Sequence, residues 1–313
     1  MVYLEKIGRG SKTYYYVTKN FRVSDKKWKK IRKYAGGKPP SKEQTRKAAE
    51  EIEKEALKKG ITKSTSEFTY LSDEEAEKLQ DLKEVFKKWY GKLDAVEKKK
   101  YDDDFVVRFT YNSNGIEGNR LSLRETSMIL TENIIPAGAT PNDFNEAINS
   151  KDCYEFMKEY DGEFNQKFLL KIHELLTKNT NCKVVGEYRD HDVRISGSEW
   201  IPPTHEKVRA DMRKVFQWYY STKKKLHPVE LGAILHNKLV RIHPFADGNG
   251  RTSRVIMNWT LLKNKFPMFY IELRDKIKYY ETVEEGDKGD DGAIVHYIAK
   301  VLMEQHTFEP TGG

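Results

Sequence analysis

The stretch from Ile242 to Arg254, IHPFADGNGRTSR, combines a side chain that can move a proton with groups that can hold a phosphate chain. The apolar helical pattern before it ends at Pro244, which leaves His243 at the helix terminus and at the mouth of a loop. An imidazole there can take a proton from an attacking hydroxyl group. The Asp247 carboxylate cannot bind phosphate directly, but it can hold the Mg²⁺ that bridges phosphate oxygens. The sequence therefore predicts a general base and a metal ligand in one loop.

The next residues have the composition of an anion-binding turn. Gly248, Asn249 and Gly250 can adopt positive φ and bring backbone N–H groups close to a ligand. A helix that begins here offers its free N–H groups and its dipole to an anion. Arg251 and Arg254 are three residues apart, so we expect both to project from one face of its first turn. Amides and guanidinium groups together suit a polyphosphate, because they meet spread negative charge with directed donors.

Each of these residues also has an ordinary structural role. A histidine after an apolar helix commonly makes a structural hydrogen bond, and a Gly-Asn-Gly turn between helices is unremarkable. Two arginines three residues apart are common on helices. Their occurrence in this order within one short stretch favours a ligand site over a plain helix–helix turn.

The same stretch resembles the signature of the Fic family, HxFx(D/E)GNGRxxR, at every defined position, and the similarity extends over roughly residues 70–305. The resemblance implies an all-helical core that transfers a nucleoside monophosphate, usually AMP from ATP with Mg²⁺, to a protein hydroxyl group. Both glycines of the turn are present, which favours nucleotidyl transfer over phosphotransfer within the family. By position, the resemblance assigns the general base to His243, packing behind the loop to Phe245, Mg²⁺ to Asp247, the α- and β-phosphates to Gly248, Asn249 and Gly250, the phosphate chain to Arg251, and the γ-phosphate to Arg254.

A second segment, SNGIEG from Ser113 to Gly118, resembles the inhibitory pattern (S/T)xxxE(G/N) of the same family. The pattern is short, but here it precedes a complete signature. The resemblance implies that Glu117 pairs with Arg254 and occupies the donor that the γ-phosphate needs. A charge-assisted pair of this kind contributes ~1.5–3 kcal/mol. Glu117 can alternatively position a hydrolytic water, so removal of AMP stays open. The same resemblance places Tyr279 and Tyr280 near the base, with plain packing as the alternative.

The rest of the chain predicts a mainly α fold with a Fic-type helical core over 64–313, including an inhibitory helix around 94–118. One segment, 186–203, breaks the helical pattern and predicts a β-hairpin with Ser196 and Gly197 at its tip. Fic proteins carry a target-docking flap at this place, which the resemblance assigns to Val193, Arg194 and Ile195. The expected helices are 73–90, 94–113, 122–131, 141–160, 164–179, 204–221, 227–242, 249–263 and 289–304.

Residues 1–63 form a separate basic segment, with 19 Lys/Arg against 7 Asp/Glu and hence a net charge of +12, whereas the whole chain carries +8. We expect strands at Tyr3–Ile7, Thr13–Thr18 and Lys30–Tyr34, with turns at Gly8, Gly10, Asn20 and Gly36–Gly37 and a charged helix over 42–59. Gly8–Thr13 lacks the spacing of a phosphate-binding loop and is a hairpin turn. Aromatic residues among lysines (Phe21, Trp28 and Tyr34 beside Lys26, Lys27, Lys29, Lys30, Arg32 and Lys33) can bind nucleic acid. A protein partner or a solvated face would use the same residues.

The composition bounds the remaining possibilities. Cys153 and Cys182 are the only cysteines, which speaks against a disulfide framework, and we expect ordinary buried thiols. His173–Glu174 and His191–Asp192 lack metal-site spacing and are expected at solvated positions. No apolar run is long enough to span a bilayer and no leader opens the chain, so we expect a cytoplasmic protein with no membrane partner.

Two functions follow. The first is a protein adenylyltransferase that moves AMP from ATP to a Ser, Thr or Tyr hydroxyl of a target protein and is autoinhibited by Glu117. The second is a nucleic-acid-associated regulatory protein whose Fic core uses another nucleotide or also removes AMP. The sequence leaves open the target, the nucleotide in vivo and the oligomeric state, a homo-oligomer included.

Overall fold

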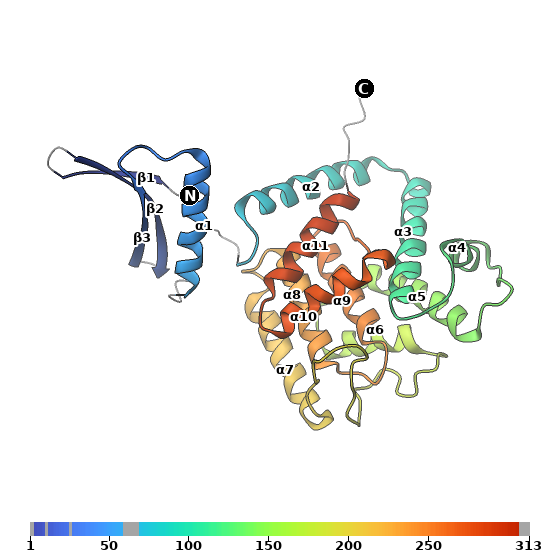
Figure 1. Cartoon of the computed structure of the whole chain (residues 1–313). Coiled ribbons are helices and arrows are strands. Elements are labelled where there is room, and N and C mark those ends of the chain that lie inside the picture. The colour runs from blue at the N-terminus through green and yellow to red at the C-terminus, as the bar shows by residue number, and fades with distance from the viewer. Residues whose placement is uncertain (1–2, 10–11, 25–26, 59–68, 307–313) are drawn as a thin grey trace. The chain divides into compact units, whose positions relative to one another are not determined.

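The computed structural model describes residues 3–9, 12–24, 27–58 and 69–306. The chain divides into two compact units, Met1–Asp73 and Glu74–Gly313, which are treated separately below (Figure 1). The predicted boundary at 63/64 lies outside the described residues.

The N-terminal unit is a three-stranded antiparallel sheet with one helix. The strands β1 (Tyr3–Arg9), β2 (Lys12–Ser24) and β3 (Lys27–Gly36) pair in the order β1-β2-β3, and α1 (Lys42–Lys58) follows. The Ser41 hydroxyl caps α1 by accepting the Gln44 N–H at 3.2 Å. The strands run further than predicted, because Asn20 pairs with Lys30 inside the β2–β3 ladder instead of forming a turn. Gly8 likewise pairs with Thr13, while Gly10 lies outside the described residues.

Alternation along the strands gives this unit a small core on one face of the sheet. Val17, Phe21 and Ile31 pack there against Ile52 and Ala56 of α1. The Phe21 ring is only 1% exposed, so the prediction that it lies on a nucleic-acid surface is wrong. Phe21 lies on the same face of β2 as Val17, four residues further along the strand, and packs there against α1.

The second unit is helical, as predicted from the 3.6-residue periodicity. Its elements are α2 (Asp73–Lys92), α3 (Ala95–Ile116), α4 (Leu123–Glu132), α5 (Pro141–Glu159), α6 (Gln166–Thr177), α7 (His205–Thr222), α8 (Pro228–Ile242), α9 (Asn249–Lys263), the 3₁₀ turn η1 (Leu273–Asp275), α10 (Lys276–Asp287) and α11 (Gly292–Gln305). The helix α10 was not predicted, because only Tyr279, Val283 and Gly286 of its length are buried and they give little periodic signal.

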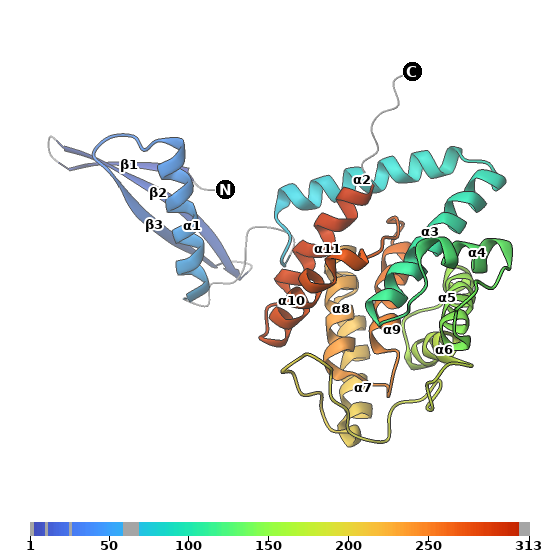
Figure 2. The ribbon, with the colours of Figure 1, turned by 45° about the vertical axis from the view of Figure 1, so that its right-hand side comes forward.

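The helices α8 and α9 form the centre of this unit (Figure 2). They pack against each other over their length, with α11 on α8 and α6 on α9. Both are buried almost all round, and Trp259 of α9 is the largest fully buried side chain of the described residues. The turn between them, at residues 243–248, is therefore held by rigid elements on both sides.

The prediction of a β-hairpin at 186–203 is wrong. The chain does reverse at its tip, where Gly197 has φ +78° and the Ser198 N–H donates to Ile195 O at 3.2 Å, but no strand forms in this segment. The reason is that its polar groups bond to the helical core instead of across the segment, as the Arg189 N–H does with Pro244 O at 3.0 Å. Pro202 and Pro203 also lack the N–H that a ladder needs.

Among the described residues, no helix has both the length and the apolarity required to cross a membrane. Cys153 is buried, as expected, whereas Cys182 is half-buried, and both thiols are free.

Phe21→Ala is expected to unfold the N-terminal unit and to leave the helical unit folded. Truncation of a buried Phe costs about 3–5 kcal/mol, which is comparable with the whole stability of so small a core. Backbone NMR spectra of the full chain would show the loss of the dispersed strand signals alone. Tyr34→Ala, which removes a ring that is 59% exposed, is the matched control and should keep those signals.

Candidate active site

His243 ends α8 in a conformation that is unusual for a residue with a side chain. Its backbone is left-handed, with φ +50° and ψ +60°, which costs of order 1 kcal/mol and needs surrounding support. The His243 N–H donates to Leu239 O at 2.9 Å, and its carbonyl oxygen accepts Nε of Arg189 at 2.8 Å. The turn that presents the imidazole is thus fixed by backbone contacts on both sides.

The hydrogen bonding of the ring determines which nitrogen is free. Nδ1 lies 3.2 Å from the Val240 carbonyl oxygen, which can only accept, so Nδ1 carries the hydrogen. This leaves the lone pair on Nε2, in a cavity that His243 helps to line. Burial lowers the pKa of His243 below its ordinary value, despite the hydrogen bond to Val240. The imidazole is therefore neutral at pH 7 and able to accept a proton.

Arg189 supports this turn and was not predicted from the sequence. Its guanidinium group is buried and donates to the backbone carbonyl oxygens of His243, His191 and Pro203. It thereby ties the segment 186–203 to the end of α8. The acceptors are backbone atoms, and those of Pro203 and His243 are distant in the chain, so the local sequence gives no signal for this role.

A second histidine, His173 of α6, holds the loop from below. Its ring stacks on Phe245, with centroids 3.8 Å apart and planes 4° from parallel. Nδ1 accepts the Gly186 N–H at 3.0 Å, which leaves Nε2 protonated to donate to Asp247 O at 3.0 Å. Burial lowers the pKa of His173 to about 4. The prediction of a solvated position for His173 is wrong, because the loop covers it; His191 is exposed, as predicted.

The turn itself is closed by Asn249. Its side chain accepts the Phe245 N–H at 2.9 Å and donates to Phe245 O at 2.8 Å. Gly248 has φ +74°, and a side chain there would also approach Thr177 to 2.8 Å. The amides of residues 249–251 begin α9 without a side-chain cap, and the contacts of the described residues include no acceptor for them. These N–H groups form an anion site at a helix N-terminus.

A cavity of about 480 Å³ lies over this turn. It brings together parts of the chain that are far apart in sequence: the end of α3, the segment around Gly197, the α8–α9 turn and α10. The predicted site residues in its lining are Glu117, Arg194, Ile195, His243, Asp247, Gly248, Asn249, Gly250 and Arg254. Ser113, Gly118, Val193 and Arg251 lie outside the lining.

Arg251 and Arg254 were expected on one face, but their guanidinium groups have different partners. Arg251 is buried and donates to Glu146 of α5 at 2.8 Å and to Asp247 at 3.3 Å. Asp247 remains 58% exposed and also accepts the Gly248 N–H at 2.6 Å. Arg251 thus orients the Asp247 carboxylate in this structure, and Glu146, which the sequence did not indicate, holds Arg251.

Arg254 binds the end of α3. Its Nη2 lies 2.7 Å from Glu117 Oε1 and 2.8 Å from Ser113 O, and its Nε donates to the Ser113 hydroxyl at 3.0 Å. Ser113 O is available because the Glu117 N–H bonds to Asn114 O in the tightened last turn of α3. Burial opposes the charge on Arg254, but the Glu117 carboxylate and the Tyr279 hydroxyl together outweigh it, and the pKa of the guanidinium is raised. The predicted Glu117–Arg254 pair is therefore present.

The carboxylate of Glu117 lies directly against the start of α9. A side chain on Gly250 would overlap Glu117 Oε1 and would crowd Arg254 Nη1 at 3.0 Å. Glycine at this position thus allows a negatively charged group to reach both the helix N-terminus and Arg254.

Tyr279 and His236 form the floor beneath Arg254. The Tyr279 hydroxyl lies 2.7 Å from His236 Nε2, and both side chains are buried. Burial raises the pKa of Tyr279, although Arg254 counteracts it. Tyr279 and Tyr280, which the resemblance placed near the base, both line this cavity.

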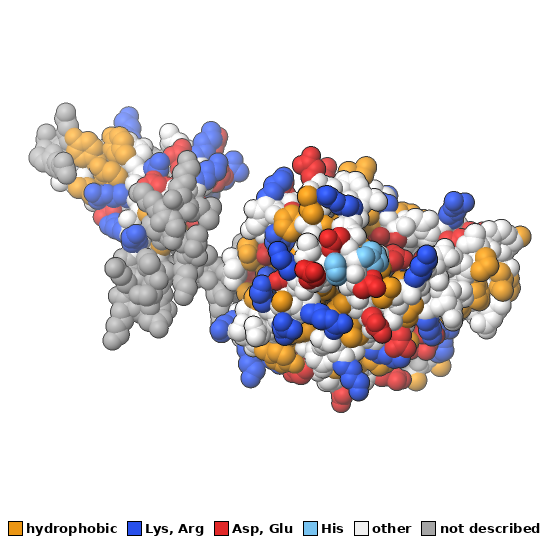
Figure 3. All heavy atoms as spheres, turned by 90° about the horizontal axis from the view of Figure 1, so that it is seen from below, with side chains coloured by type: hydrophobic (Ala, Val, Ile, Leu, Met, Phe, Trp, Pro, Cys, Tyr) orange, Lys and Arg blue, Asp and Glu red, His pale blue; other side chains and the backbone are white. Residues whose placement is uncertain are grey.

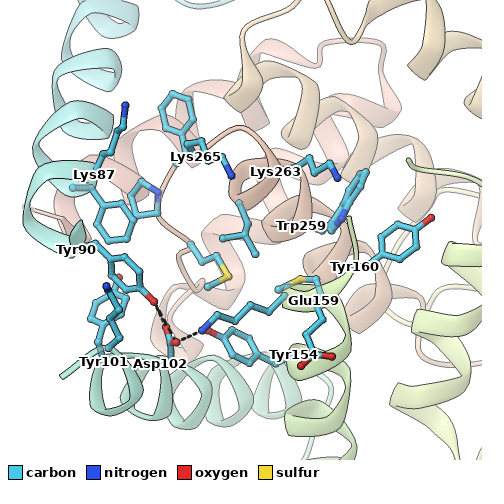
Figure 4. A pocket seen from close by; sticks show the side chains of 18 of the residues that line it. Lys87, Tyr90, Tyr101, Asp102, Tyr154, Glu159, Tyr160, Trp259, Lys263 and Lys265 are labelled. Atoms are coloured by element: carbon cyan, nitrogen blue, oxygen red, sulfur yellow. Dashed lines mark hydrogen bonds and ion pairs between the residues drawn. The ribbon is translucent and has the colours of Figure 1, made fainter. Parts of the chain in front are cut away.

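A second cavity, of about 500 Å³, lies between α2, α3, α5 and α9 (Figure 4). Its walls combine aromatic side chains, with Tyr90, Tyr101, Tyr154 and Trp259 among them, with lysines, and Asp102 binds both Tyr90 and Lys158. It contains none of the predicted site residues. The chemistry of the α8–α9 turn is therefore confined to the first cavity.

Comparison with known proteins agrees with this assignment. The sequence profile described as Fic/DOC family matches residues 163–261. Proteins named protein adenylyltransferase Fic are similar over a longer range. The protein from Aedes aegypti is 32% identical over 206 residues, 64% of this chain and 41% of its own length. That from Nematostella vectensis is 30% identical over 195 residues, 61% of this chain and 45% of its own length. The chain thus spans less than half the length of these relatives.

Solved structures show the same fold. A Fic domain containing signaling protein from Bacteroides thetaiotaomicron superimposes with a TM-score of 0.66 at 27% identity, over 74% of this chain and 95% of its own. Fic-1 from C. elegans gives a TM-score of 0.65 at 23% identity, over 85% and 76% of the two chains. The helical unit accordingly has a Fic-like fold.

The buried histidines predict a loss of stability in mild acid. Burial lowers the pKa of His173 to about 4 and that of His236 to about 3, so the folded protein binds fewer protons than the unfolded chain below about pH 6.5. The free energy of unfolding is fully present above that pH, and it falls by up to ~1.4 kcal/mol per pH unit for each such histidine. Urea titrations of the full chain at pH about 7 and about 5.5 measure it. A stability unchanged between them would contradict the neutral assignment, and His173→Gln should flatten the dependence.

Proposed function

We propose that this chain, which carries a Fic/DOC domain at residues 163–261 and is related at about 30% identity to the protein adenylyltransferases named Fic, transfers AMP from ATP to a hydroxyl group of a target protein. The observation that carries the proposal is one cavity that holds a free imidazole nitrogen, the uncapped start of α9 and the Arg254–Glu117 pair. A proton acceptor next to an anion site is what hydroxyl attack on a phosphate requires.

In the proposed reaction the hydroxyl oxygen of the target attacks the α-phosphorus of ATP. A new P–O bond forms, the bond from the α-phosphorus to the bridging oxygen breaks, and pyrophosphate leaves with that electron pair. The hydroxyl proton goes to Nε2 of His243. The other ring proton stays on Nδ1, which donates it to the Val240 carbonyl oxygen; this hydrogen bond orients the ring and stabilises the imidazolium that forms. The lowered pKa of His243 keeps this acceptor unprotonated at neutral pH.

The negative charge of the triphosphate is met by the start of α9. The free amides of residues 249–251 donate to phosphate oxygens, and the small Gly250 allows their close approach. Arg254 binds the terminal phosphate when Glu117 leaves it. Asn249 serves through its backbone, since its side chain closes the turn on Phe245.

The donor set of the site fits Mg²⁺ held jointly by protein and nucleotide. Asp247 is the acidic side chain of the turn, and no group of three or more ligating side chains occurs within the described part of the chain. Mg²⁺ commonly binds through one or two carboxylates together with substrate phosphates and water. Asp247, positioned by Arg251 and the Gly248 amide, would supply that carboxylate. When bound, the ion neutralises charge that develops on the phosphates.

Glu117 acts as the inhibitory group in this proposal. It occupies the guanidinium that would hold the γ-phosphate, so ATP binds without the geometry needed for attack at the α-phosphorus. Glu117 is 34% exposed while Arg254 is buried, so the carboxylate is the partner that can move away. The segment at Arg194 and Ile195 lines the same cavity and is the proposed docking edge for the target.

Glu117→Gly is expected to increase labelling by about 10- to 100-fold, because removing a charge-assisted pair of ~1.5–3 kcal/mol frees Arg254. The measurement is transfer of α-labelled AMP to the chain itself and to proteins of an extract, with intact mass spectrometry to identify the adduct. His243→Ala in either background should abolish the transfer. Glu132→Gln, an exposed carboxylate outside the cavity, is the control. Equal, low labelling by wild type and Glu117→Gly with ATP still bound would count against the switch.

Asp247→Asn is expected to lower the rate of transfer by at least tenfold in the Glu117→Gly background and to shift the Mg²⁺ requirement to higher concentrations. The physical reason is that a neutral amide is a poor ligand for a hard cation. Initial rates across a Mg²⁺ titration give the result. A rate and a Mg²⁺ midpoint identical to those of the parent would exclude Asp247 as the metal ligand.

A further inference from the structure

The sheet of the N-terminal unit has two chemically different faces. Residues paired across β2 and β3 lie on the same side, so Lys33 lies on the side of Val17 and Arg32 on the side of Thr18. The first side packs on α1. The second is here called the open face, and its described side chains are Tyr3, Glu5, Ile7, Tyr14, Tyr16, Thr18, Asn20, Lys30, Arg32 and Tyr34.

The acidic residues of α1 compensate charge on the helix side alone. Lys19 bonds to Glu53, and Lys33 lies 3.3 Å from Glu51 and 3.7 Å from Glu55. Lys19 and Lys33 are therefore paired, and α1 contributes no carboxylate to the open face among the contacts of the described residues. Lys29, which is opposite Phe21 on the helix side, has no ion pair with a described residue, so unpaired positive charge is present on both sides of the sheet.

The open face presents tyrosine rings beside cationic groups. Tyr34 is 59% and Tyr3 43% exposed, and the Arg32 guanidinium lies 5.1 Å from the centre of the Tyr16 ring. The Tyr16 and Tyr34 rings contact each other at 5.5 Å. The Tyr16 and Tyr34 rings thus form a tilted pair, and the Arg32 guanidinium lies over one of them.

A single carboxylate, Glu5, is present on the described open face, and it is already paired. Lys30 lies 2.7 Å from Glu5 Oε1, and the Thr18 hydroxyl donates to Oε2 at 3.1 Å. Arg32 has no carboxylate within ion-pair distance among the described residues. It remains available to an external anion.

The positive charge of the sequence is concentrated in the N-terminal unit. Residues 19–33, which span the β2–β3 hairpin, contain eight Lys/Arg and one Asp. The first 63 residues carry a net charge of +12 and the whole chain a net charge of +8, so the chain after residue 63 carries −4. On the side of the helical unit drawn in Figure 3, basic and acidic side chains are intermingled. The basic character is therefore a property of the N-terminal unit.

We infer that the open face of the β1–β2–β3 sheet binds nucleic acid. Phosphate oxygens would bind Arg32 and Lys30 of the open face, and the tyrosines would offer ring faces to bases and hydroxyls to the backbone. An acidic protein would satisfy these cationic groups but does not explain the exposed Tyr3 and Tyr34 rings. The surface differs from the sequence prediction, since Phe21 is buried, Lys29 and Lys33 lie on the helix side, and Tyr3, Tyr14 and Tyr16 belong to the open face. Lys26 and the side chains of Lys27 and Trp28 lie outside the described structure.

Arg32 and Lys33 provide a matched pair of variants. They are neighbours in β3, each carries one positive charge, and they lie on opposite faces of the sheet. Fluorescence anisotropy of the full chain would be measured with a labelled duplex of mixed sequence and with one of its single strands, over a range of NaCl concentrations. Arg32→Gln should weaken binding by about 3- to 10-fold and lower the slope of log K against log salt by about 1. Lys33→Gln should leave both within about twofold.

The outcomes separate the alternatives. Binding confined to the duplex, or to the single strand, supports the inference and identifies the form bound; Tyr34→Ala should then weaken single-strand binding by about tenfold through lost stacking. No retention of either probe at low salt overturns the inference, as does an equal loss for Arg32→Gln and Lys33→Gln. Thermal unfolding of both variants checks that the sheet is intact, and none of these readouts depends on nucleotide transfer.

Discussion

The buried guanidinium of Arg254 is the group on which the arrangement of the site depends. A cation taken out of water needs a partner of opposite charge, and breaking such a pair is far more costly than never forming it. Here the partners come from the last turn of α3, so the charge on α9 fixes where α3 ends. The same requirement makes Arg254 a selective position, because only another anion of suitable shape can replace Glu117 there. The α8–α9 turn and the proposed inhibitory group are therefore parts of one electrostatic unit.

The second constraint is steric and keeps the imidazole of His243 in place. A left-handed residue at the end of α8 is stable only because Arg189 holds its carbonyl and Asn249 and His173 hold the loop that follows. These supporting side chains are buried, so water does not compete for their hydrogen bonds. Burial also removes protons from the histidines, and the same packing thus sets both the position and the protonation state of the base.

Much of this could be predicted from the sequence, and the failures have physical causes. The turn at residues 242–254 was accessible because a turn and a helix start have local signals, whereas the pair Glu117–Arg254 was expected only from the resemblance to the Fic motifs. The mainly helical fold followed from periodicity. The partners Arg189 and Glu146 were not accessible, because they bind backbone oxygens or side chains that only the tertiary fold brings near. The expected β-hairpin failed for the same reason, since the core and not a second strand satisfies its backbone. Phe21 and Asn20 were misplaced because strand pairing outweighs local residue preference.

The strand pairing of the N-terminal unit has a further consequence, for fidelity of folding. A slip of one residue between β2 and β3 would turn Arg32 towards α1 and Lys33 outwards, and it would expose Ile31 while burying Lys30. Such a slip would be energetically unfavourable, because the small core would be lost. The bulges between Tyr15 and Tyr16 and between Arg22 and Ser24 anchor the alignment at both ends of the ladder. The alternation of residues along each strand thus determines which side chains face outwards. One residue inserted in β3 would therefore change the outward surface completely while leaving the composition almost untouched.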